Sequence, residues 1–196
     1  METGTIIQGI VGIILAWFTY NQYTKNKMTD LKIENIQQNN RENSLKNSRI
    51  IAIVFGELWK LLHDINADRC FIVQPDPLGR IMYISVIYEV DKSGISIAKD
   101  DLQNIPYSEV GDFVDEISTN CWLEYTPDNE VKNGKIRSLR KMRGTNYSRL
   151  KQLVNIKGEW IGSLIVENNT KDFPSDVKDK MKITANTIQY ILPPIN

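Results

Sequence analysis

Few residues of this 196-residue chain have side chains that could carry out chemistry. His63 is the only histidine, and the two cysteines, Cys70 and Cys121, lie far apart. A multi-histidine metal site is therefore excluded, and no Cys-x-x-Cys pair is present to bind zinc or to act as a redox centre. The sequence also contains no glycine-rich phosphate loop and no nucleophile elbow. It predicts a non-enzymatic protein with no catalytic residue, no metal site and no cofactor.

Charge is unevenly distributed along the chain, although the totals balance at 24 basic and 24 acidic residues. Residues 89–130 are rich in acidic side chains, whereas residues 132–151 carry basic side chains and no acidic one. Such a run is either a solvated flexible loop or a contact surface for a second copy of the chain or for an anionic membrane. Nucleic acid is the least favoured partner, because the run lacks interleaved aromatic residues for base stacking. The basic patch consists of Lys132, Lys135, Arg137, Arg140, Lys141 and Arg143.

Alternation along two predicted strands indicates where a ligand pocket would lie. Tyr83 and Ser85 fall on one face of the first strand, and Arg149 and Lys151 fall on one face of the second. If these faces lie under the helix predicted over 106–119, the two basic side chains would favour an anionic small molecule. The alternative is that this face is merely covered by the helix or is open to water.

The elements that would position these residues follow from the pattern of apolar residues. Apolar side chains recur at helical spacing over 48–65 and again in a closing segment that begins at Pro174 or Ser175. This pattern indicates an α+β fold, an antiparallel sheet with the N- and C-terminal helices packed on one face. Runs rich in β-branched and aromatic residues predict strands over 67–74, 81–90, 121–125, 147–156 and 160–168.

Two stretches resemble the GAF family of small sensor domains, which are relatives of PAS domains. The first is the helix that runs into "INADRCFIVQPDPLGR", and the second is "LVNIKGEWIGSLIVENNTKDFPSDVKDKMKITANTIQYI", with the family's G-x-L-x-V strand, polar loop, Phe and closing helix. The resemblance covers residues 48–192 and implies a sensing or protein-interaction domain. The Asn-Lys-Phe-Asp-Glu set of members that bind cyclic nucleotides is not visible, nor is a bilin-attachment cysteine, so neither ligand is implied.

An uncharged and mostly apolar segment opens the chain. No residue from Thr3 to Thr24 is charged, and as a helix this segment would span roughly 33 Å, close to a hydrocarbon core of about 30 Å. The aromatic residues near its end and the lysines that follow are typical of a membrane interface rather than of a cleaved signal. A buried core helix is the alternative to a single-pass anchor over 1–24. Small residues on one face would favour association between anchors: Thr5, Gly9, Gly12 and Ala16.

A polar segment over 25–47, rich in Asn, Gln, Lys and Glu, separates the anchor from the globular domain at 48–196. We expect a helical stalk here. Basic residues, beginning with Lys25 and Lys27, follow the anchor and none precedes it. The positive-inside rule then predicts an inner (plasma) membrane protein whose globular domain is cytoplasmic.

The layout of one N-terminal membrane helix, a polar stalk and a GAF-like domain is also similar to the large holins of T-even bacteriophages, which display their domain in the periplasm. Two hypotheses follow. The first is a non-enzymatic, oligomeric membrane protein whose GAF-like domain binds a protein regulator or an anionic small-molecule ligand. The alternative is a phage holin-like lysis protein, whose membrane helix forms lesions in the lipid bilayer and whose domain is bound by an inhibitor.

Overall fold

The computed structural model describes residues 38, 44–76 and 82–192. By its internal contacts the chain divides into two compact units, residues 1–49 and 50–196. The sheet, both cores and the candidate site belong to the second unit.

The predicted membrane anchor and most of the predicted stalk lie outside the described residues. The same holds for the association residues of the anchor, Thr5, Gly9, Gly12 and Ala16. Residues 38 and 44–49 of the first unit are helical. Among the helices that the structure describes, none is long and apolar enough to cross a membrane.

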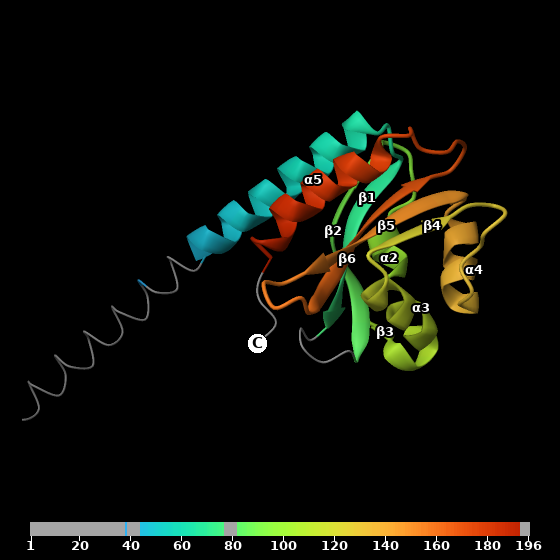
Figure 1. Ribbon diagram of the computed structural model, residues 1–196, viewed down its shortest axis with the longest axis horizontal. Helices are drawn as coiled ribbons and strands as arrows, with labels where there is room; N and C mark the ends of the chain where they lie inside the picture. Colours follow the sequence, from blue (N-terminus) through green and yellow to red (C-terminus); the bar gives the residue numbers. More distant parts are fainter. Residues whose placement is uncertain (1–37, 39–43, 77–81, 193–196) are drawn as a thin grey trace, which may run out of the picture. The chain divides into compact units, whose positions relative to one another are not determined.

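A six-stranded antiparallel sheet forms the centre of the second unit (Figure 1). Its strand order is β3-β2-β1-β6-β5-β4, so the hairpins β1–β2 and β5–β6 meet in the middle, where β1 pairs with β6. Strand β4 forms one edge of the sheet, and β3 forms the other. The strands are β1 (Arg69–Asp76), β2 (Tyr83–Asp91), β3 (Ile105–Pro106), β4 (Trp122–Tyr125), β5 (Tyr147–Val154) and β6 (Trp160–Asn168).

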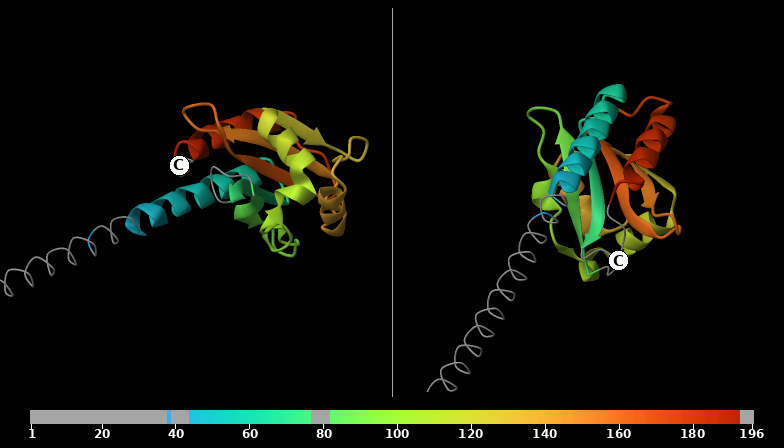
Figure 2. Two further views of the ribbon diagram at one scale, coloured as in Figure 1. Left: turned by 90° about the horizontal axis from the view of Figure 1, so that it is seen from below. Right: turned by 90° about the vertical axis from the view of Figure 1, so that its left-hand side faces the viewer.

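Helices cover both faces of this sheet (Figures 1 and 2). Residues 50–64 of the first helix, which covers 44–64, share one apolar cluster with the last helix. Three other helices cover the opposite face. The predicted α+β architecture, with the first and last helices on one face, is confirmed for the described residues. The remaining helices are α2 (Ala98–Asp101), α3 (Tyr107–Thr119), α4 (Gly134–Met142) and α5 (Val177–Gln189).

The first core lies between the sheet and the first and last helices. Val54, Leu58 and Leu62 recur every fourth residue, so they form one apolar stripe along the first helix. Met181 and Ile188 of α5 meet this stripe in the same cluster. Full burial of each such side chain contributes about 1.5–3 kcal/mol as an upper estimate, so this layer holds the two helices on the sheet.

The second core lies on the opposite face of the sheet, under α3. Phe113 and Ile117 of α3 pack in one cluster with Phe71 of β1. On β2, Ile84 and Val86 belong to this second core. The register between β1 and β2 shifts between Ile72 and Val73. On the other side of this shift, Tyr88 and Val90 of β2 belong to the first core. The bulge therefore changes which residues of β2 face the second core.

Helix α4 forms within the basic run, for which a flexible loop was one of the two interpretations of the sequence. Asn133 caps its N-terminus, because Asn133 Oδ1 accepts from the backbone N–H of Ile136 at 3.0 Å. Asn133 Nδ2 donates in turn to Asp112 Oδ1 at 2.5 Å, which fixes α4 against α3. Ile136 and Arg140 are one turn apart, and both are buried. The helix therefore presents a basic side chain to the interior of the domain.

Candidate ligand-binding site

An ion pair between two neighbouring strands is buried on the face of the second core. Arg69 and Glu167 are register partners, and Arg69 Nε donates to Glu167 Oε2 at 3.0 Å. Thr145 Oγ1 donates to the same oxygen at 3.0 Å and accepts from Arg69 Nη2 at 2.7 Å. Arg69 also donates to the carbonyl of Ser96 at 2.7 Å and to Asn169 Oδ1 at 2.8 Å. Every nitrogen of the Arg69 guanidinium is thus satisfied, as burial of a charge requires.

A second buried arginine shares the Glu167 carboxylate. Arg143 Nη2 donates to Glu167 Oε1 at 3.3 Å, and Arg143 Nη1 lies 3.7 Å from Asp101 Oδ2. Arg143 Nε and Nη1 have no hydrogen-bond partner. Arg69 and Arg143 therefore share the buried carboxylate of Glu167, and two nitrogens of Arg143 have no hydrogen-bond acceptor.

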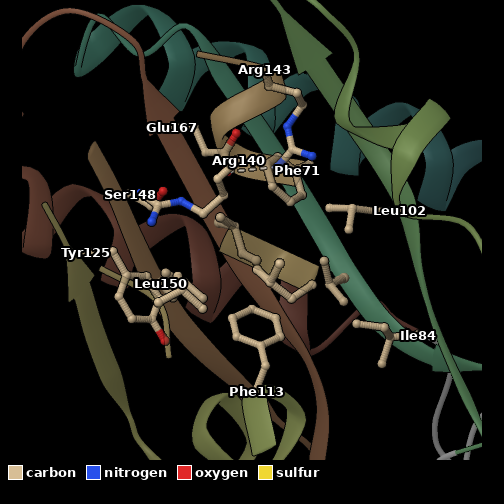
Figure 3. A pocket seen from close by; sticks show the side chains of 14 residues that line it. Phe71, Ile84, Leu102, Phe113, Tyr125, Arg140, Arg143, Ser148, Leu150 and Glu167 are labelled. Carbon is tan, nitrogen blue, oxygen red and sulfur yellow. Dashed lines mark hydrogen bonds and ion pairs between the residues drawn. The ribbon is translucent and has the colours of Figure 1, made fainter. Parts of the chain in front are cut away.

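A small cavity lies between the sheet and the helices α3 and α4 (Figure 3). Its volume is about 20 Å³, which holds roughly one water molecule. Phe113 and Ile84 lie at its apolar end (Figure 3). The polar end is formed by Arg140, Arg143, Ser148 and Glu167.

Most buried polar atoms without a partner belong to residues that line this cavity. In the described part of the chain, six buried side-chain nitrogen or oxygen atoms lack a hydrogen bond, and five of them belong to lining residues. Each unpaired buried group costs about 1–3 kcal/mol, and such groups usually mark a site for water, an ion or a ligand. The five atoms are Tyr125 Oη, Arg140 Nε, Arg143 Nε, Arg143 Nη1 and Ser148 Oγ.

Arg140 is a buried cation that no carboxylate neutralises directly. Its side chain is 6% exposed, and among the described residues it forms no ion pair within 4.0 Å. Its guanidinium carbon lies 5.4 Å from the centre of the Tyr125 ring, and Nη2 donates to the carbonyl of Asn146 at 3.4 Å. Burial lowers the pKa of Arg140, although an arginine stays charged at neutral pH. Arg140 is therefore available to bind an anion.

An open hollow of about 160 Å³ adjoins Arg140. Arg140 lines both this hollow and the small cavity, so it connects the two spaces. Basic side chains of α4 line the hollow, together with hydroxyl and amide side chains from the flanking loops. Its lining residues are Thr126, Pro127, Glu130, Arg137, Arg140, Lys141, Gly144, Thr145 and Asn146.

The structure places Arg149 and Lys151 on the face of β5 away from this cavity. Their neighbours on β5, Ser148 and Leu150, line the cavity, and successive side chains of a strand point to opposite faces. Arg149 instead lies 5.5 Å from the ring of Phe173, which packs against the first core. Arg149 also pairs with Asp172 at 2.6 Å, and Lys151 donates to the carbonyl of Cys121 at 3.3 Å.

Tyr83 and Ser85 likewise do not line the cavity. Their neighbours on β2, Ile84 and Val86, point into the second core, so Tyr83 and Ser85 point away from it. Ser85 Oγ accepts from the backbone N–H of Asn104 at 2.9 Å. The four residues expected to form a ligand site are therefore not brought together under α3.

The basic patch is divided between the surface and the interior. Most of its exposed members pair with acids of the preceding acidic run, Lys135 with Glu109, and Arg137 and Lys141 with Glu130. Lys132 is exposed. Its remaining members, Arg140 and Arg143, are buried at the cavity.

Sequence reasoning missed Arg69, Glu167 and Ser148 as members of the site. A signal was present in the strand pattern, since Arg69 shares its parity with Phe71, and Glu167 shares its parity with Ile165. Charged residues at inward positions of buried strands are rare unless they are paired.

Both cysteines are free thiols, with Cys70 buried and Cys121 exposed. Burial raises the pKa of Cys70 well above its ordinary value. Within the described residues, no group of three or more His, Cys, Asp and Glu side chains could hold a metal ion.

The fold is similar to solved GAF domains of cyanobacteriochromes and phytochromes. The PixJ GAF domain of Thermosynechococcus elongatus matches with a TM-score of 0.59 at 15% identity, over 74% of this chain and 84% of that one. GAF3 of Slr1393 from Synechocystis matches with a TM-score of 0.58 at 12% identity, over 71% of this chain and 90% of that one. The chromophore-binding domain of phytochrome P1 from Stigmatella aurantiaca matches with a TM-score of 0.52 at 15% identity, over 70% of this chain and 52% of that one.

No protein-family model matches the sequence, and no curated protein matches it. The likeness to solved structures nevertheless establishes the architecture. The second unit has a GAF-like fold.

Proposed function

We propose that the GAF-like domain is a non-enzymatic sensing module that binds a small ligand on the α3–α4 side of its sheet. The observation that carries this proposal is the set of unpaired, buried donors of Arg140, Arg143 and Ser148 around one cavity. A domain selected only for stability would replace these groups with apolar ones, because unpaired donors destabilise a core. Their retention supports a binding role.

The size of the space limits the ligand. One structural neighbour is a chromophore-binding domain, but the cavity of about 20 Å³ here has no room for a chromophore. The hollow of about 160 Å³ at Arg140 is larger. We therefore place the ligand in the hollow, with Arg140 connecting it to the cavity behind.

The test is a thermal unfolding screen of the full chain, purified in mild detergent, against anionic, neutral and cationic metabolites. We expect at least one ligand to raise the Tm saturably, and we expect Arg140→Lys and Thr126→Val, which alter two residues of the hollow, to reduce the response. Lys182→Ala, at an exposed position of α5, is the matched control and should respond like the wild type. A panel without any response, or a response that Arg140→Lys and Thr126→Val leave intact, overturns the proposal.

Membrane attachment is part of the proposal. It is supported by the uncharged segment between Glu2 and Lys25, whose length suits a bilayer. Association of anchors through their small residues would make the protein oligomeric. The sensing domain would then be cytoplasmic at the inner (plasma) membrane, as the basic residues after the anchor favour, and a protein regulator could respond to the ligand-bound domain.

The layout of anchor, stalk and GAF-like domain also favours the second candidate, a phage holin-like lysis protein with a periplasmic domain bound by an inhibitor. The exposed thiol of Cys121 is a natural topology probe, because Cys70 is buried. In intact cells, a membrane-impermeant maleimide should leave Cys121 unlabelled if the domain is cytoplasmic. Labelling of the wild type but not of Cys121→Ser, together with lysis on expression, would instead support the holin-like function.

A further inference from the structure

We propose that the hollow beside α4 binds a phosphate-type oxyanion, with Arg140 as the residue that anchors it. This inference rests on the proposed function and names the chemical class of its ligand. The anion could be a free phosphate or the headgroup of a phospholipid, since the recognising chemistry is the same.

The charges around the hollow do not balance. Arg137, Arg140 and Lys141 line it together with one carboxylate, Glu130. Glu130 is already shared, because it lies 3.8 Å from Arg137 Nη1 and 3.1 Å from Lys141 Nζ. Glu167, behind Arg140, is likewise bound to Arg69 and Arg143. Three cations and one anion leave the hollow with an excess of two positive charges.

Arg140 supplies the buried donors that an anion requires. Its Nε has no hydrogen-bond partner, and Nη2 makes one long bond of 3.4 Å. A guanidinium presents its N–H groups in a planar fork that matches two oxygens of a phosphate or carboxylate. The ring of Tyr125, 5.4 Å from the guanidinium carbon, contacts the cation without satisfying its donors. An oxyanion in the hollow would offer the guanidinium a charged acceptor.

The hollow also offers a neutral donor and enough space. Thr126 Oγ1 accepts from the backbone N–H of Asn129 at 3.2 Å, so its own hydroxyl hydrogen remains able to donate. The volume of about 160 Å³ exceeds the roughly 10–15 Å³ that one water requires by about tenfold. A tetrahedral oxyanion with part of its hydration shell fits this space.

The test is calorimetric titration of orthophosphate into the full chain, purified in mild detergent at low ionic strength. Saturable binding is expected, and Arg140→Met should weaken it by about tenfold or more, as expected for loss of a charged hydrogen-bonding partner. Arg137→Ala with Lys141→Ala removes two exposed cations and should weaken binding several-fold. Lys171→Ala with Lys182→Ala removes two exposed cations elsewhere and should leave binding unchanged.

Two further arms make the outcomes distinct. Thr126→Val, at the rim, tests the hollow even if Arg140→Met does not fold, and should also weaken binding. In the second arm, vesicles containing phosphatidylglycerol replace orthophosphate. If the chain binds the vesicles but not orthophosphate, and this binding depends on Arg137 and Lys141, the oxyanion is a lipid headgroup.

The proposal is overturned if neither probe binds, or if binding is the same in the two-lysine control and in the variants of the hollow. If the chain binds neither phosphate probe but is stabilised by another metabolite, only the proposed class of ligand is wrong. A chain stabilised by no ligand contradicts the proposed function as well.

Discussion

Arg69 and Glu167 face each other in register across the central strands β1 and β6, and their side chains form a buried ion pair of 3.0 Å. The pair joins two hairpins that are distant in sequence. Thr145 and Arg143, which follow α4, bond to the same carboxylate. Glu167 thus connects the segment after α4 to the centre of the sheet.

Removing the carboxylate should therefore destabilise the domain strongly. Glu167→Ala leaves Arg69 buried without its counter-charge and leaves Arg143 only the longer contact with Asp101, and we expect a loss of about 3–5 kcal/mol in the free energy of unfolding. Urea unfolding followed by tryptophan fluorescence measures it. Asp68→Ala, which removes the partly exposed pair with Lys92 and one hydrogen bond from the backbone N–H of Asn169, should lose less than Glu167→Ala. Equal losses would show that the buried pair is not the stronger restraint.

Two buried serines of the sheet offer a matched test of the unpaired donors. Ser148 Oγ has no partner, whereas Ser163 Oγ accepts from Trp160 Nε1 at 3.1 Å. We expect Ser148→Ala to leave stability unchanged or raise it, and Ser163→Ala to lower it by about 1 kcal/mol. The same urea unfolding experiment measures both. A clear loss of stability for Ser148→Ala would mean that its hydroxyl has a partner in solution.

Gly162 explains the glycine of the G-x-L-x-V pattern. Its φ is +153°, and a Cβ there would lie 2.6 Å from the carbonyl oxygen of Val73 on the neighbouring strand. Gly162→Ala should cost at least about 2 kcal/mol through strain and overlap. Gly56→Ala on the first helix, where a Cβ meets nothing within 4 Å, should instead stabilise by about 0.5–1 kcal/mol. Similar effects at both positions would contradict this account.

The two cysteines should differ sharply in reactivity. Burial raises the pKa of Cys70, which keeps it as the unreactive thiol, whereas Cys121 is exposed. A small maleimide should modify Cys121 at least about 100-fold faster than Cys70 in the native protein, because Cys70 reacts only after opening of the core. Mass spectrometry of the time course measures both rates. Equal rates would show that the first core is not closed around Cys70.

Stability should depend on pH through Glu89, which accepts from the backbone N–H groups of Ala98 and Lys99 at the start of α2. Burial raises the pKa of Glu89 above its ordinary value. Between the unfolded and folded pKa values the native state binds more protons, so the stabilising contribution is fully present below the ordinary pKa of about 4.3 and is lost as pH rises through the folded value.

Glu89→Gln removes that titration. The stability of the wild type relative to Glu89→Gln should therefore fall as pH rises from about 4 to neutrality, because this window contains the ordinary glutamate pKa. Unfolding curves at several pH values measure the difference. A difference that rises over the same range would mean that the capping bonds to α2 outweigh burial.

The sequence predicted the face of the sheet that carries the first and last helices well, because the signals for these elements are local. The helix over 48–65, which carries the stripe of Val54, Leu58 and Leu62, follows directly from the helical spacing of its apolar residues, and strands β5 and β6 follow from their β-branched and aromatic residues. Helix α4 is not predicted by the sequence pattern, because its basic composition hides the two inward positions Ile136 and Arg140.

The site was less accessible to sequence reasoning. Arg149 and Lys151 have the basic side chains that an anion site requires, but they lie on the face of β5 away from the cavity. Ser148 and Leu150 occupy the positions of β5 that face the cavity. Arg69 and Glu167 meet only through the long-range pairing of β1 with β6, which no local pattern specifies. Strand parity together with the register, rather than residue type alone, decides which charges reach the cavity.

The most direct test of ligand sensing is amide hydrogen exchange of the full chain, with and without saturating orthophosphate or the metabolite that most raises its Tm. We predict slower exchange in α4 and in residues 126–131, which flank the hollow at Arg140, and little change in α5. Slower exchange confined to α5 and the first helix, or no change anywhere with a ligand that binds, would contradict a sensing site on the α3–α4 side of the sheet.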